Sequence, residues 1–132
     1  MAGINNPVFI MKYFYFLLLT LWLSNAKAQK ITGLWYSGDS TRIYEIKSSG
    51  TDEYSAIIKS SSRRNDSVGY CAIKNLKFNA RKKRYEGIIY SVADNKPTGV
   101  KIKFGKDPDK IILKLNRMFI MNVTIYWKRV AG

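Results

Sequence analysis

Apolar and polar residues alternate with a period of two along much of the chain after residue 30. In the segment 98–104, for example, Val100 and Ile102 fall on one face while lysines occupy the other, and the pattern returns at 111–115 and 121–127. This period is typical of half-buried strands, because successive side chains of a strand point to opposite faces. No later window shows a sustained helical period, so the pattern predicts an all-β protein.

Short apolar segments between turn residues predict about eight or nine strands. Before the last three strands, the segments are 33–37, 41–47, 54–59, 68–78 with an interruption expected at Lys74 or Asn75, and 85–91. The connections are too short for crossovers between parallel strands, which favours an antiparallel meander. Because closure removes exposed sheet edges, we expect a single up-and-down β-barrel of about eight strands. A two-sheet sandwich shares the same alternation and stays open as an alternative.

The amino-terminal region has a different pattern. Lys12 is followed by the apolar run Tyr13–Leu23, and small residues stand at Ala26 and Ala28. A basic residue, an apolar run and small residues in this order are typical of a secretory signal peptide, with cleavage expected before Gln29. The run is short for a membrane span, and a permanent anchor or a buried helix is the alternative.

We therefore predict a signal peptide at residues 1–28 and one exported domain at residues 29–132, in a periplasm or outside the cell. The residues before Met11 carry no charge and do not fit a signal of this design, which makes Met11 a candidate for the true start. Cleavage would remove two lysines and no acidic residue from a formal net charge of +14, leaving +12 on 104 residues. Such a charge attracts polyanions, although it also serves to keep a small barrel soluble.

Several segments together suggest a family. They are Gly33-Leu34-Trp35, the hairpin 39–46, Tyr54-Ser55-Ala56-Ile57, the strand 85–90 and the closing Tyr126-Trp127-Lys128-Arg129-Val130. In these segments the chain resembles a family of bacterial secreted domains of unknown function with a lipocalin-like, or calycin, barrel. The resemblance covers nearly all of Ile31 to Val130, but the polar loop 60–67 is short where relatives carry a longer segment with proline.

The resemblance also implies how the barrel closes. Lipocalins carry Gly-x-Trp on the first strand and an arginine from the last strand over the tryptophan. Gly33, Trp35 and Arg129 match these positions. A guanidinium on an indole face contributes a cation–π interaction of about 0.5–2 kcal/mol, so the implied role of these residues is stability.

The residues of common catalytic sites are scarce. The chain has no histidine, which removes the commonest general base and the commonest transition-metal ligand. Cys71 is the single cysteine and is expected to be a small buried hydrophobe. Carboxylates such as Glu45 and Glu86 are available, but their spacing selects no pair. We expect no cofactor and no metal, and an enzyme that uses carboxylates is the least favoured of three hypotheses.

Aromatic residues make up 14% of the chain and supply candidates for a ligand pocket. Six of them fall at positions predicted to face inward: Tyr44, Tyr54, Tyr70, Tyr90, Phe104 and Trp127. A barrel of about eight strands either fills with side chains or holds one small ligand. The sequence leaves both interpretations open, and the first hypothesis is an exported monomeric module that binds a small apolar or amphipathic molecule.

Clustered cations supply the second hypothesis. They are Arg63 and Arg64 in the polar loop, and Arg81, Lys82, Lys83 and Arg84 in a hairpin tip. Together they are candidates for one basic patch that docks on an anionic envelope component or on an acidic partner protein. A solvated turn is the alternative, and no nucleic-acid-binding motif accompanies the cations.

Overall fold

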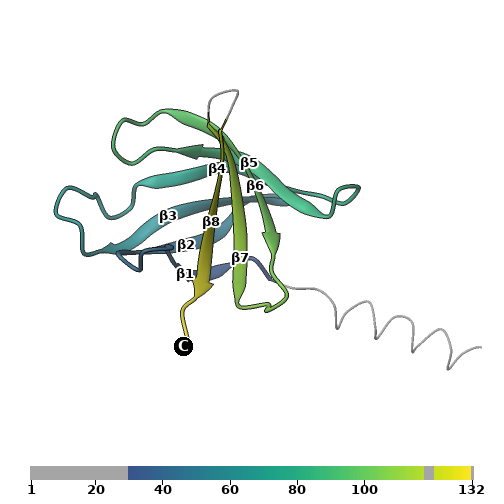
Figure 1. Cartoon of the computed structure of the whole chain (residues 1–132), viewed down its shortest axis with the longest axis horizontal. Helices are drawn as coiled ribbons and strands as arrows, with labels where there is room; N and C mark the ends of the chain where they lie inside the picture. The colour runs from purple at the N-terminus through teal and green to yellow at the C-terminus, as the bar shows by residue number, and fades with distance from the viewer. Residues whose placement is uncertain (1–29, 118–120, 132) are drawn as a thin grey trace, which may run out of the picture. The chain divides into compact units, whose positions relative to one another are not determined.

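The computed structural model describes residues 30–117 and 121–131 (Figure 1). The compact unit that begins at Ile31 is built of eight strands, and no helix occurs within these ranges. The strands are β1 (Gly33–Tyr36), β2 (Arg42–Gly50), β3 (Glu53–Ser61), β4 (Cys71–Asn79), β5 (Arg84–Tyr90), β6 (Pro97–Phe104), β7 (Lys110–Arg117) and β8 (Met121–Arg129). The predicted signal peptide, residues 1–28, lies outside the described residues.

Every strand pairs antiparallel with the next one in sequence, and β1 pairs with β8 to close the sheet. The closing ladder is short, with Trp35 opposite Arg129 and Tyr36 opposite Lys128. The predicted single up-and-down barrel is therefore confirmed. A two-sheet sandwich is ruled out because one continuous sheet returns to its own first strand.

The alternation in the sequence sorts side chains between the interior and the outside. Val100 and Ile102 on β6 are buried, as are Leu113 and Trp127 on the last two strands. The lysines between them are exposed. Burial of one such apolar side chain stabilises the fold by about 1.5–3 kcal/mol, which makes this inner face the main source of stability.

β4 is the irregular strand of the barrel. Its register against β5 shifts between Lys74 and Lys77, and Asn75 has a φ of 56°, in the left-handed region that asparagine tolerates better than most residues. The interruption predicted at Lys74 or Asn75 is confirmed. Gly87 on β5 lies beside this irregular part of β4. A Cβ on Gly87 would lie 3.0 Å from the Leu76 Cα, so glycine permits the close approach of β5 to β4.

The start of β4 differs from the prediction. The strand begins at Cys71 instead of Val68, which is 70% exposed. Gly69, with a φ of 95°, turns the chain just before the strand, and its N–H donates to the Ile58 carbonyl oxygen at 2.8 Å. Cys71 is half-buried, so the expectation of a small buried hydrophobe at this position was wrong.

Successive connections of an up-and-down barrel lie at alternate ends. We call the end with the β1–β2, β3–β4 and β5–β6 connections the mouth. The opposite end, with the β2–β3, β4–β5 and β6–β7 connections, is the base. In Figure 1 the long β3–β4 connection extends to the left and the β4–β5 hairpin to the right.

Candidate ligand-binding site

A cavity of about 390 Å³ opens at the mouth. It is lined by residues of the mouth connections and by inward residues of the strands beneath them, including Ser37, Asp39, Arg42, Tyr44, Arg63, Ile89, Ser91, Thr98, Leu115, Ile125 and Trp127. Small-molecule pockets occupy about 300–1,000 Å³, so the cavity can take a ligand of modest size. The barrel is thus filled with side chains in part and hollow at one end.

Two aromatic rings in parallel contact line the cavity. The Tyr44 and Trp127 rings stack with centroids 4.3 Å apart and an angle of 7° between their planes. Both residues are buried, and burial raises the pKa of the Tyr44 phenol above its usual value. Ile89 and Ile125, half-buried against the core, extend this apolar surface. The stack therefore forms part of the apolar lining of the cavity.

A partly buried ion pair supports one side of the mouth. Arg42 donates through Nε to Asp66 Oδ2 at 2.5 Å and through Nη2 to Oδ1 at 3.0 Å. Ser61 Oγ donates to the same carboxylate at 2.6 Å. The Arg42 hydrogen bond and then that of Ser61 lower the pKa of Asp66 to about 2. This bidentate pair ties β2 to the β3–β4 connection.

A second pair supports the β1–β2 turn. Asp39 accepts hydrogen bonds from Thr41 Oγ1 at 2.7 Å, from the Thr41 N–H at 3.1 Å and from Ser37 Oγ at 2.8 Å. Arg63 of the β3–β4 connection donates to its other oxygen. Chiefly because of the hydrogen bonds from Thr41, the pKa of Asp39 lies well below its usual value. Both arginines that line the cavity are therefore matched by carboxylates.

The predicted pocket residues separate into groups. Tyr44 and Trp127 line the cavity, whereas Tyr54 packs edge-on against Tyr85 with ring centroids 5.9 Å apart, and Phe104 packs against Trp35. Neither Tyr54 nor Phe104 lines the cavity.

Tyr70 and Tyr90 are not part of the Tyr44–Trp127 stack. The Tyr70 hydroxyl donates to Asn95 Oδ1 at 2.6 Å, and this hydrogen bond joins two of the mouth connections. Burial raises the pKa of the Tyr70 phenol. Tyr90 is also one of the residues that line the cavity, and its ring lies under the ammonium of the exposed Lys74, 4.9 Å from the ring centroid. Its neighbour Ile89 packs inward, so the inward position expected for Tyr90 was wrong.

The three residues matched to lipocalin closure meet at the base. The Arg129 guanidinium carbon lies 4.2 Å from the centroid of the Trp35 ring, and Trp35 Nε1 donates to the Ile31 carbonyl oxygen at 2.9 Å. Gly33 has a φ of 132°, and a Cβ there would lie 2.9 Å from Arg129 Nη1. Glycine at this position therefore leaves the room that the guanidinium occupies.

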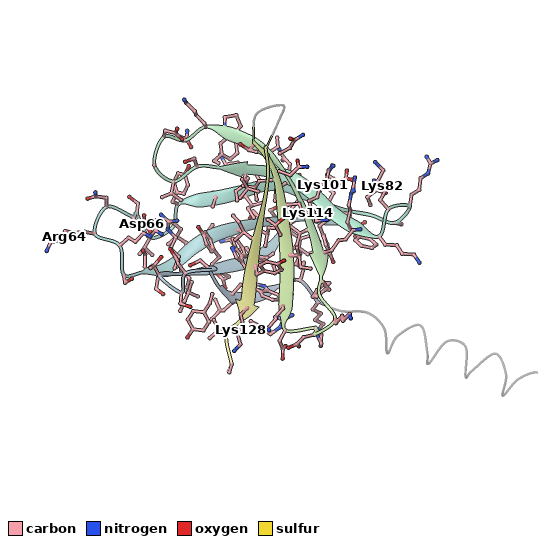
Figure 2. The ribbon with its side chains drawn as sticks, viewed as in Figure 1. Arg64, Asp66, Lys82, Lys101, Lys114 and Lys128 are labelled. Carbon is pink, nitrogen blue, oxygen red and sulfur yellow. The ribbon has the colours of Figure 1, made fainter. Side chains whose placement is uncertain are left out.

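The six predicted surface cations do not form one patch. Arg63 and Arg64 lie in the β3–β4 connection at the mouth, whereas Arg81, Lys82, Lys83 and Arg84 lie at the β4–β5 hairpin at the base. Figure 2 shows Arg64 and Lys82 on opposite sides of the barrel. The expectation of a joint patch was wrong because the whole length of β4 separates the two connections.

The sequence reasoning missed Arg42 and Asp66. They are 24 residues apart, and nothing in the local pattern of either residue indicates the other. Asp39 was recognised as a turn residue, which its bonds to Ser37 and Thr41 explain, but its contact with Arg63 depends on two connections meeting at one end of the barrel.

Within residues 30–117 and 121–131, no cluster of cysteine and acidic side chains is arranged to hold a metal ion. The same ranges contain no helix long and apolar enough to cross a membrane. Comparison with known proteins found no matching family model, no matching curated protein and no matching solved structure.

Proposed function

We propose that the protein is an exported, lipocalin-like binding module that holds a small molecule with an apolar body in the mouth cavity. The observation that carries the proposal is an open cavity of about 390 Å³ whose lining includes the Tyr44–Trp127 stack and the apolar side chains of Ile89 and Ile125. An aromatic or other apolar group would bury surface against this lining, and each square ångström removed from water contributes about 25 cal/mol.

The charges at the rim favour an uncharged ligand. Arg42 is held by Asp66 and Arg63 by Asp39, so the rim has no excess charge from these residues despite the basic character of the chain. An anionic ligand would have to displace a carboxylate from its arginine. A molecule with an apolar body and a neutral polar end would instead meet hydroxyl groups such as that of Ser91 beside the cavity.

A fluorescence titration with the neutral probe N-phenyl-1-naphthylamine tests this function. We expect saturable enhancement of probe fluorescence at one site per chain, together with quenching of tryptophan emission because Trp127 lines the cavity. The variant Ile125→Trp fills the cavity and should weaken probe binding at least tenfold.

Tyr126→Trp is the matched control, because Tyr126 is adjacent on β8 but points outward and is 61% exposed. It should leave probe binding unchanged. Circular dichroism checks folding, and Ser91→Trp at the rim provides a second obstruction if Ile125→Trp does not fold. Absence of saturable binding to the natural chain, or equal binding by the folded cavity-filling variant, would overturn the proposal.

A further inference from the structure

The outer face of the barrel has a second concave region, a groove of about 570 Å³ across β5 to β8. The groove is hollow because Gly99 on β6 has no side chain. Gly99 stands opposite Ile88 in the β5–β6 ladder, and the register that pairs Val100 with Leu115 places Asn116 on its other side. A Cβ added at Gly99 would meet no atom within 4 Å. The sheet surface is therefore open at this point, between larger neighbours.

Two lysines border the hollow and directly face each other. Lys101 on β6 pairs with Lys114 on β7, both are exposed, and neither forms an ion pair with a described residue. Figure 2 shows both side chains on this part of the barrel. Like charges directly opposite in a ladder are destabilising, and a bound anion would relieve that repulsion.

The acidic side chain in the lining of the groove, Glu86, is paired with Arg84 of the same lining. Glu86 stands opposite Lys101 on β5, but its Oε1 accepts a hydrogen bond from Arg84 Nε at 2.8 Å. That bond is the main cause that lowers the pKa of Glu86, so the carboxylate stays ionised beside the hollow. The groove thus contains two unmatched ammonium groups and one matched acid.

Uncharged polar groups complete the lining. Asn116 pairs with Asn122 and Lys114 with Thr124 in the β7–β8 ladder, and all four residues are exposed along the groove. Amide and hydroxyl groups both donate and accept hydrogen bonds, which suits a ligand rich in hydroxyl groups. An ammonium pair suits a phosphate group, which lysine binds as a point charge.

We propose that this groove is a binding site for a phosphorylated sugar, with the phosphate between Lys101 and Lys114 and the sugar hydroxyl groups against Asn116 and Asn122. The site is independent of the mouth cavity, and no lining residue except Leu115 is common to both.

Titration of the full chain by isothermal calorimetry tests the site, with glucose 6-phosphate, inorganic phosphate and glucose as probes at matched ionic strength. We expect glucose 6-phosphate to bind at least tenfold more tightly than inorganic phosphate, and glucose to show no binding. Equal affinity for the two phosphates would overturn the assignment of a sugar, and binding of neither would overturn the site.

Two variants locate the binding. Gly99→Leu fills the hollow without changing the charge, and Lys101→Gln with Lys114→Gln removes both ammonium groups; each should weaken glucose 6-phosphate binding at least tenfold. The control is Lys110→Gln with Lys128→Gln, which removes another exposed lysine pair that faces across the β7–β8 ladder.

The control variant should retain the affinity of the natural chain. If it loses as much affinity as the first lysine pair, the attraction is a property of the net charge and the proposed site is wrong. Circular dichroism confirms folding of each variant, and probe binding at the mouth should be unchanged in all of them.

Discussion

The two ends of the barrel use the same kinds of side chain to opposite effect. At the base, the Arg129 guanidinium carbon lies 4.2 Å from the centroid of the Trp35 ring, and Trp35 is fully buried. At the mouth, Arg42 bonds to Asp66, and the stacked Tyr44 and Trp127 rings border a cavity. An arginine next to aromatic rings therefore closes one end and leaves the other open.

The partner of the guanidinium accounts for the difference. At the base, Arg129 Nε lies 3.4 Å from Asp109 Oδ1, a longer contact than that between Arg42 and Asp66, and the guanidinium also lies over the Trp35 ring. At the mouth, the Arg42 guanidinium donates two hydrogen bonds to Asp66 in the β3–β4 connection. Because a carboxylate fixes its position, Arg42 borders the entrance without filling it.

The largest effect should come from removing the packing at the base. Trp35→Ala deletes a fully buried indole and the surface on which Arg129 rests, so we expect the free energy of unfolding to fall by about 3–5 kcal/mol in a urea titration. Tyr126→Ala, which removes an exposed aromatic ring, should cost far less. Equal losses in the two variants would show that Trp35 does not close the base.

The partly buried Arg42–Asp66 pair at the mouth should have an intermediate effect. Asp66→Asn leaves the Arg42 guanidinium without a carboxylate where their side chains are 16% and 5% exposed, and it should cost about 1–3 kcal/mol at neutral pH. Because the pKa of Asp66 falls from 3.8 to about 2 on folding, its contribution is complete above pH about 4 and is lost as the pH falls through 2.

Urea titrations at pH 7 and pH 2 measure this dependence. The natural chain should lose more stability between these values than Asp66→Asn does, since the amide cannot be protonated there. If both chains lose the same amount, the Arg42–Asp66 pair does not contribute to acid sensitivity.

The smallest effect should come from the exposed pair at the rim. The Arg63 and Asp39 side chains are 46% and 48% exposed, so water competes for the contact. Arg63→Gln should leave the urea midpoint unchanged, in contrast to Arg42→Gln at the partly buried pair. A shift in midpoint as large as that of Arg42→Gln would mean that the Arg63–Asp39 pair stabilises the fold as much as the Arg42–Asp66 pair does.

Particular strands show how far local pattern extends. The alternation in 98–104 correctly predicted that Val100 and Ile102 face the core, and a residue of the Lys74-Asn75 pair does interrupt β4. The same reasoning placed Tyr90 inward, although the preceding Ile89 takes the inward position. Near the end of a strand, an apolar pair such as Ile89-Tyr90 fits either orientation, and packing decides between them.

The candidate sites depended more on distant contacts. Arg63 and Arg81 belong to two basic clusters that look alike in sequence, yet β4 places them at opposite ends. The hollow at Gly99 arises from its neighbours on β5 and β7, whose identities follow from the register of the ladders. Composition indicated that cations were abundant, but not which lysines would face each other.

By itself, the sequence determined the class of this fold, because a period of two along the chain can bury one face only in a sheet, and short connections require antiparallel neighbours. Tertiary structure alone decided that the interior is filled at the base and hollow at the mouth. That outcome depends on which side chains meet across the barrel, such as Tyr44 with Trp127, and these contacts join residues that are far apart in the chain.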